Sequence, residues 1–210
     1  MIKKNLKTLI ITSLIILLPI LAGVILWNRL PEQIPTHWNA AGEVDGWSSK
    51  PFAVFGLPGI LLAAQWLCVL VTGADPKKAN HPEKVLKLVL WIIPLLSVVL
   101  GVITYATAMG KAVRVEIILP VIIGLLFTVI GNYMPKCKQN YTIGIKIPWT
   151  LNSEENWNRT HRFAGRLWVV CGLLIMLTGF LGGFWVFLPI VILMVLAPFI
   201  YSYVLHRKGI

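Results

Sequence analysis

Charged residues are scarce in this sequence. Asp, Glu, Lys and Arg make up 13% of its 210 residues, whereas about 25% is usual in soluble domains. Hydrophobic residues make up 57%, and the mean hydropathy is +0.79. This composition excludes an ordinary soluble domain and indicates a chain that lies largely in a membrane.

Acidic residues are the rarest of the charged ones. Eight Asp and Glu stand against 19 Lys and Arg, which gives a net charge of +11. In a soluble protein such an excess would suggest nucleic acid as a partner. In a membrane protein, Lys and Arg instead gather in the cytoplasmic segments. We therefore use the positive charge as a guide to orientation, and we expect no direct binding of nucleic acid.

Cysteine is also scarce. Cys68, Cys137 and Cys171 are the three in the chain, and no two of them have the CxxC spacing. We therefore expect neither a disulfide framework nor a zinc site. Cys68 and Cys171 lie in apolar segments and are expected to be buried, whereas Cys137 lies in a polar segment and is expected to be open to thiol reagents.

Six apolar runs are each near the ~20 residues that a helix needs to cross a bilayer. They cover residues 8–27, 52–73, 88–109, 115–134, 167–183 and 185–205. A tight turn at Gly182-Gly183 would join the last two runs. The sequence thus predicts an all-α, polytopic protein of the cell membrane with about six transmembrane helices.

The distribution of Lys and Arg predicts the orientation of these spans. If the N-terminus is cytoplasmic, 15 of the 19 Lys and Arg fall in cytoplasmic segments and four fall in outer segments. Because positive residues favour the cytoplasmic side, both termini and the polar segment 135–166 are expected there.

Ionisable residues are missing from deep inside the predicted spans. Proton-coupled transporters and pumps usually carry such residues at depth, so this absence counts against that class. A small transporter or flippase for a lipid or peptide stays open, because apolar substrates need no buried charge. HExxH, GxSxG and paired intramembrane aspartates are absent too, which counts against an intramembrane enzyme. We expect no enzymatic activity and no cofactor.

The polar stretch from Gly144 to Arg166 is the most informative part of the chain. Gly144 and Pro148 break regular structure and predict an irregular first half. Asn152 or Ser153 is expected to cap a helix whose first turn contains two glutamates, where negative charge suits the helix dipole. The helix would then run without a break into an apolar segment, as an amphipathic helix that continues as a span.

Two faces of this helix differ in chemistry. Trp157, His161, Ala164 and Trp168 recur at spacings of four, three and four, so they share one face. The opposite face carries Arg159, Arg162 and Arg166, with Glu155 placed four residues before Arg159 as a partner. Either these arginines hold anionic head groups or they contact a specific partner, and the sequence leaves both interpretations open.

The loop after the first span is stiffened by prolines and contains glycine turns. We expect a folded outer cap with Trp38 and Trp47 at the membrane interface. His37, Glu43 and Asp45 match no strong metal motif, so no metal is expected. His37, Trp38 and Asp45 are our candidates for structural or toxin-facing positions.

Two parts of the sequence together resemble a known family. The segments GIKIPWTL at 144–151, SEENW at 153–157 and RFAG at 162–165 are similar to the signature of the SdpI family of bacterial immunity proteins. Residues 30–47 resemble a small domain of unknown function that often precedes this signature. Lys146 stands where arginine is common in the family, and lysine cannot replace the two-pronged binding of arginine.

The resemblance implies a division of the chain and a function. Residues 1–52 would form the first transmembrane helix with the outer domain, 53–134 three further transmembrane helices, and 135–210 the SdpI-like loop, amphipathic helix and last two spans. Such proteins protect a cell from a secreted peptide toxin, and some also signal by drawing a winged-helix autorepressor to the membrane. The expected partners are thus membrane lipids, the toxin and, for signalling members, the repressor. The resemblance implies toxin- or partner-response roles for Gly144, Pro148, Trp149, Thr150, Glu155, Trp157, Arg162, Phe163 and Gly165.

Overall fold

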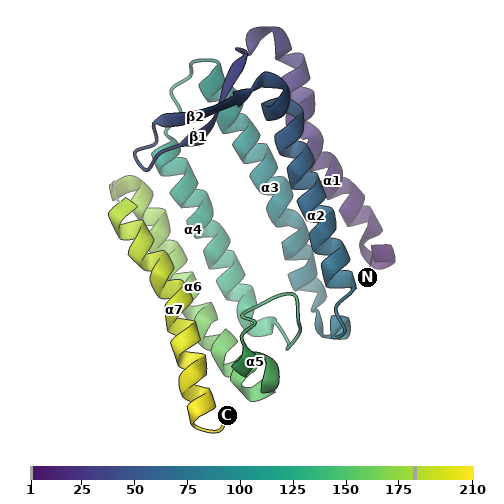
Figure 1. The fold of residues 1–210 in the computed structure, drawn as a ribbon, viewed down its shortest axis with the longest axis vertical. Coiled ribbons are helices and arrows are strands. Elements are labelled where there is room, and N and C mark those ends of the chain that lie inside the picture. The colour runs from purple at the N-terminus through teal and green to yellow at the C-terminus, as the bar shows by residue number, and fades with distance from the viewer. Residues whose placement is uncertain (1, 182–183) are drawn as a thin grey trace. The chain divides into compact units, whose positions relative to one another are not determined.

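Helices dominate the computed structural model, which describes residues 2–181 and 184–210. The long helices are α1 (Ile2–Ile25), α2 (Leu57–Gly73), α3 (Glu83–Ala108), α4 (Val115–Tyr133), α6 (Glu154–Leu181) and α7 (Phe184–Arg207) (Figure 1). Taken with the π-helical turn Phe52–Gly56 before α2, six helices are long and apolar enough to cross a membrane. The all-α, polytopic fold and the multi-pass membrane localisation are therefore confirmed. The predicted turn at Gly182-Gly183 lies outside the described residues.

The chain forms two compact units. The first consists of Met1–Gly73 with Lys87–Val115, and the second consists of Ala74–Leu86 with Glu116–Ile210. The connection between α2 and α3 therefore belongs to the same unit as residues 144–165, the signature segment. More than fifty residues separate the two in sequence.

A β-hairpin in the first unit forms the cap that the sequence predicted only as a folded loop. Strands β1 (Gln33–Trp38) and β2 (Val44–Ser49) pair antiparallel, with Gln33 opposite Ser49 and Trp38 opposite Val44. The turn is organised by Asn39, whose side-chain oxygen accepts bonds from the backbone N–H groups of Ala41 and Glu43 at 2.9 and 3.0 Å. Such Asx geometry is typical of tight turns.

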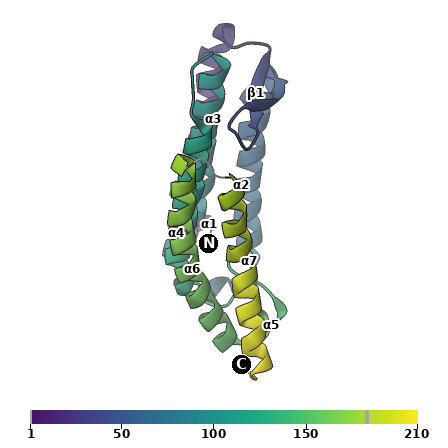
Figure 2. The same cartoon turned by 90° about the vertical axis from the view of Figure 1, so that its left-hand side faces the viewer.

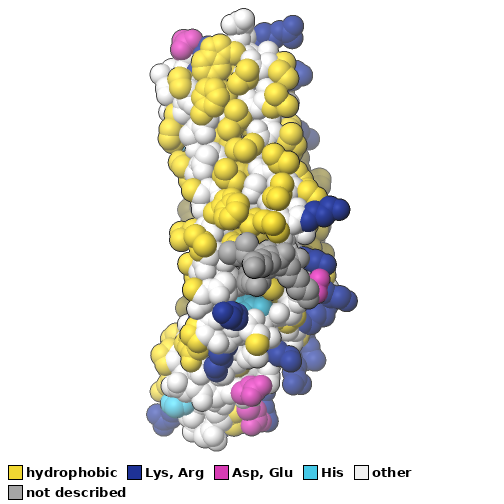
Figure 3. Space-filling model, turned by 90° about the vertical axis from the view of Figure 1, so that its right-hand side faces the viewer, with side chains coloured by type: hydrophobic (Ala, Val, Ile, Leu, Met, Phe, Trp, Pro, Cys, Tyr) yellow, Lys and Arg dark blue, Asp and Glu magenta, His cyan; other side chains and the backbone are white. Residues whose placement is uncertain are grey.

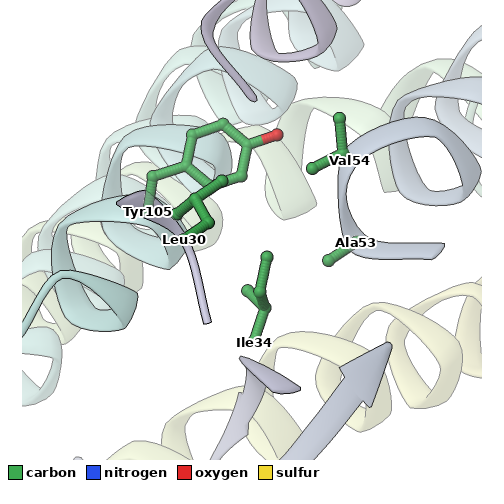
Figure 4. Close-up of a cluster of buried hydrophobic side chains, with 5 residues drawn as sticks. All are labelled: Leu30, Ile34, Ala53, Val54 and Tyr105. Atoms are coloured by element: carbon green, nitrogen blue, oxygen red, sulfur yellow. The ribbon is translucent and has the colours of Figure 1, made fainter. Parts of the chain in front are cut away.

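The base of the hairpin rests on buried apolar side chains and one buried lysine. Leu30, Ile34, Ala53, Val54 and Tyr105 form the apolar cluster (Figure 4). Lys50 is 6% exposed, and its Nζ donates to the Leu30 carbonyl at 3.0 Å and lies 2.7 Å from the Glu32 carboxylate. A buried ammonium needs such partners, so Lys50 ties the strand end to the chain that follows α1.

Polar side chains join the helices of the first unit within the membrane. Gln65 Nε2 donates to Thr12 Oγ1 at 2.7 Å, and Ser97 and Tyr105 donate to the carbonyls of Ile16 and Pro19 at 2.8 and 2.9 Å. Interhelical hydrogen bonds of this kind hold membrane helices where no hydrophobic force between them acts.

Glycines let α4 and α6 approach closely in the second unit. A Cβ added at Gly172 would lie 2.5 Å from Thr128 Oγ1 and 2.6 Å from the Gly124 carbonyl, and one at Gly131 would lie 2.8 Å from the Gly165 carbonyl. Gly124 and Gly131 are seven residues apart, as are Gly165 and Gly172, so each pair lies on one face of its helix. This contact is the small-residue packing of membrane helices.

Helices α6 and α7 lie side by side (Figures 1 and 2). Trp168 Nε1 donates to the Met194 carbonyl at 3.0 Å, and Cys171, Ile175 and Met194 form a buried cluster between the two helices. Figure 3 shows another face, the side of α1 and α2 in the first unit, where hydrophobic side chains form a broad field and Lys, Arg, Asp and Glu gather outside it. That surface is what a chain surrounded by lipid requires.

The cysteines correct two expectations from the sequence. Cys68, expected to be buried, is exposed on α2, whereas Cys137, expected to be open to reagents, is buried. Burial also raises the pKa of the Cys137 thiol to about 11, so almost none of it is thiolate at neutral pH. Cys171 is buried, as expected.

Candidate functional site

The signature segment begins with an irregular loop and ends in α6, as predicted. Ser153 caps α6 by accepting a bond from the Asn156 N–H at 3.2 Å, and both predicted glutamates fall in the first turn. Between loop and helix lies a short helix that the sequence did not predict, α5 (Pro148–Asn152). Helix α6 continues without a break through its apolar part, so its amphipathic start and its span are one element.

Trp157 and His161 lie directly beneath the irregular loop, residues 139–147. We call these two side chains the floor of the loop. Their rings stack with centroids 4.0 Å apart, and both residues are at most 1% exposed. Trp157 Nε1 donates to the Cys137 carbonyl at 2.7 Å. His161 Nε2 accepts the Ile145 N–H at 3.0 Å, so Nδ1 carries the proton and donates to the Trp157 carbonyl at 2.8 Å.

Gly144 lies directly on this floor. Its φ of +122° is a conformation that side chains rarely adopt, and an added Cβ would lie 2.5 Å from His161 Nε2 and 3.0 Å from the Trp157 ring. Both its backbone conformation and its surroundings therefore require glycine.

Thr150 joins α5 to the same loop. It is fully buried, and its hydroxyl accepts the Ile147 N–H at 3.1 Å and lies 2.7 Å from the Ile145 carbonyl, to which it donates. Pro148 is the first residue of α5, where its missing N–H costs nothing. The Trp149 ring, unlike Thr150, contacts α7 and packs against the rings of three of its residues: Phe199, Tyr203 and His206.

Gln139 and Asn140 organise the start of the loop from within. Gln139 Nε2 lies 2.9 Å from the Thr150 carbonyl, and its Oε1 accepts from Lys77 Nζ at 2.5 Å. Asn140 Oδ1 accepts the N–H groups of Thr142 and Ile143 at 2.8 and 2.7 Å. Both amides are buried and satisfied, as buried polar groups must be.

Asp75, in the connection between α2 and α3, completes the network. Its Oδ2 accepts the Tyr141 N–H at 3.0 Å, the Thr142 hydroxyl at 2.9 Å and His81 Nε2 at 3.1 Å, and its Oδ1 accepts the Lys77 N–H at 2.7 Å. The side chains of Asp75 and His81 are 0% and 1% exposed. One carboxylate thus ties the α2–α3 connection to the irregular loop.

The electrostatics of Asp75 follow from these contacts. Burial raises the pKa of its carboxyl, but the bonds from the Lys77 N–H, the Thr142 hydroxyl, the Tyr141 N–H and His81 outweigh burial and lower it below the usual value. Asp75 is therefore a carboxylate at neutral pH.

The remaining signature residues lie around α6. Glu155 pairs with Arg159 at 2.5 Å, as predicted, and Arg159, Arg162 and Arg166 are exposed on the predicted face. The Phe163 ring stacks on Tyr201 with centroids 4.5 Å apart. Gly165 meets α4, where an added Cβ would lie 2.7 Å from the Gly131 carbonyl.

The outer-loop candidates lie on the hairpin of the first unit. His37 Nδ1 and Asp45 Oδ1 are 2.5 Å apart, and both side chains are exposed to solvent. Trp38 is half-buried at the strand end, and Trp47 is exposed. No group of three or more His, Cys, Asp or Glu able to hold a metal occurs in the part of the chain that the structure describes.

Sequence reasoning missed several members of the network. Neither Asp75 nor His81 was among the predicted site residues. Gln139 was also missed, as were Asn156 and Ser202, whose side chains join α6 to α7 by a 2.6 Å hydrogen bond. A clue was available for Asp75, since acidic residues are rare in the chain and this one lies in a connection between spans.

Comparison with known proteins agrees with this description. The SdpI/YfhL protein family model matches residues 136–202, and a domain of unknown function (DUF1648) matches residues 14–62. The immunity protein SdpI of Bacillus subtilis (strain 168) is 31% identical over 195 residues, which cover 93% of this chain and 90% of that protein. No solved structure matches the chain. The irregular loop, its buried floor and α6 thus coincide with the part that the family model covers, and the chain belongs to the SdpI family.

Proposed function

We propose that this protein is a non-enzymatic membrane immunity protein that protects its cell from a secreted peptide toxin. The observation that carries the proposal is the similarity to an immunity protein over nearly the whole of both chains. The site agrees with it, because the polar network of the irregular loop lies in the part of the chain that the family model covers.

The proposal includes an orientation, with both termini and the signature segment in the cytoplasm and the hairpin outside. The excess of Lys and Arg on the side of the termini supports this arrangement. The hairpin, with His37, Trp38 and Asp45, would meet the toxin first. The cytoplasmic signature would then be the part that recruits a winged-helix repressor, where the cell has one.

Introduced cysteines test the orientation. Lys138 and Ser49 are both exposed, the first beside the signature and the second on β2. A membrane-impermeant maleimide should label Ser49→Cys in intact cells and Lys138→Cys only in inverted vesicles. Native Cys137 and Cys171 give little background because they are buried, and Cys68, which is exposed on α2, is replaced by serine in both variants. Labelling of Lys138→Cys in intact cells would overturn the orientation.

Survival tests the function itself. The wild-type protein should restore growth to a toxin-sensitive strain that lacks its own immunity gene and is exposed to the cognate secreted peptide toxin. Gly144→Val, which cannot adopt the loop conformation without moving His161, should fail at equal membrane levels. Lys78→Gln, an exposed change on the same unit, should protect as well as the wild type. No protection by the wild type would sink the assignment.

A small transporter or flippase is the alternative function. An apolar substrate needs no buried charge, so the lack of ionisable residues inside the spans does not exclude it. Substrate-stimulated flux of a lipid or peptide in liposomes containing the purified protein would favour transport. Protection without any flux would favour immunity.

A further inference from the structure

One face of α6 combines arginines with an exposed apolar stripe. Arg159, Arg162 and Arg166 recur every three or four residues and are exposed. The same spacing continues into the apolar part of the helix, through Val170, Leu173, Leu177 and Phe180, which are all exposed as well. At 3.6 residues per turn, these positions lie on one continuous face.

The length of the apolar part matches one leaflet. Residues 170–181 span about 18 Å at 1.5 Å per residue. Half of a hydrocarbon core of about 30 Å is about 15 Å. A lipid acyl chain lying along this stripe would therefore place its head group near the arginines.

Two of the arginines have their guanidinium groups available. Arg159 is engaged by Glu155. Within the described residues, Arg162 and Arg166 have neither an ion-pair nor a hydrogen-bond partner. They are one helical turn apart, and the planar guanidinium group binds phosphate in a two-pronged way.

We propose that this face of α6 binds an anionic phospholipid, with the phosphate on Arg162 and Arg166 and an acyl chain along Val170, Leu173 and Leu177. Charge complementarity selects an anionic head group. The exposed apolar continuation selects a lipid over a soluble acidic protein, because a soluble partner cannot cover a surface that lies in the hydrocarbon core. The proposal is independent of whether the protein confers immunity.

Spin-labelled lipids test the proposal. The full chain is reconstituted in phosphatidylcholine vesicles with traces of spin-labelled phosphatidylglycerol or phosphatidylcholine, and the motionally restricted fraction is measured. The wild type should restrict phosphatidylglycerol preferentially. Because one Lys or Arg near an anionic surface contributes roughly a fivefold preference, Arg162→Gln with Arg166→Gln should reduce the preference by about tenfold or more.

Matched variants separate a specific site from general attraction. Lys78→Gln with Lys138→Gln removes the same charge from exposed positions off this face and should change the preference less than twofold. Arg162→Lys with Arg166→Lys should keep part of it, since lysine is a point charge. The proposal is overturned if the wild type shows no preference, if the Gln pair keeps it, or if the control pair loses as much. A Gln pair that keeps its lipid preference but loses protection in cells would assign the arginines to a protein partner.

Discussion

Trp157→Ala should destabilise the protein by about 3–5 kcal/mol, the range for deleting a large buried aromatic side chain. The ring is fully buried, stacks on His161 and contacts the apolar cluster of Val85 and Cys137. Its removal would leave a cavity under Gly144 and an unpaired Cys137 carbonyl. Denaturant unfolding in detergent, followed by the loss of helical circular dichroism, measures the change.

Two comparison variants show where the effect comes from. Trp157→Phe keeps an aromatic ring but loses the Nε1 bond, so it should cost about 1–3 kcal/mol for the carbonyl left unpaired. Trp185→Ala alters a tryptophan that is 84% exposed on α7 and should have little effect. If Trp157→Ala were as stable as Trp185→Ala, the conclusion that the buried Trp157 ring stabilises the loop would be contradicted.

Asp75→Asn should also destabilise the protein, by about 1–3 kcal/mol, because it leaves a buried donor without its acceptor. Three donors point at Oδ2 of Asp75. A fourth donor, the Lys77 N–H, points at Oδ1. An asparagine of the same shape has only one acceptor oxygen, so its NH₂ group must face at least one of these four donors. Glu154→Gln, at the exposed start of α6, serves as the control and should cost no more than about 1 kcal/mol.

The pH dependence of stability gives Asp75 a separate signature. Its folded pKa lies below the unfolded value of about 3.9. The stabilisation is therefore complete above that value and is lost as pH falls through the folded pKa. The difference in unfolding free energy between wild type and Asp75→Asn should narrow in acid. A difference that stays constant from pH 7 to pH 3 would contradict the role of the carboxylate.

The features that the sequence predicted correctly are local ones. Six apolar runs predicted the spans, and the spacing of Trp157, His161 and the arginines predicted the two faces of α6, because the helical period acts over a few residues. Ser153 could be recognised as a cap for the same reason.

The features that the sequence did not predict depend on distant pairings. Asp75 binds Thr142, which lies 67 positions later, and no local pattern brings the two together. The pairing of β1 with β2 was missed because prolines and a histidine obscure the alternation of the strands. The exposures of Cys68 and Cys137 were predicted from hydropathy, which does not distinguish a lipid-facing side chain from a buried one.

The central structural claim is that buried side chains, and not regular secondary structure, hold the loop of residues 139–147. Five of its backbone N–H groups donate to side chains: Tyr141 to Asp75, Thr142 and Ile143 to Asn140, Ile145 to His161, and Ile147 to Thr150. Amide groups that are bonded and shielded in this way exchange with solvent only when the structure opens.

Hydrogen–deuterium exchange of the reconstituted protein tests this claim most directly. In the wild type, the amides of these five residues should exchange as slowly as those in the interior of α6, beyond its first turn. Asp75→Asn should speed the exchange of Tyr141 and Thr142 more than that of Ile147, which Thr150 holds independently. Exchange across residues 141–147 of the wild type at the rates of an unstructured peptide would contradict the account.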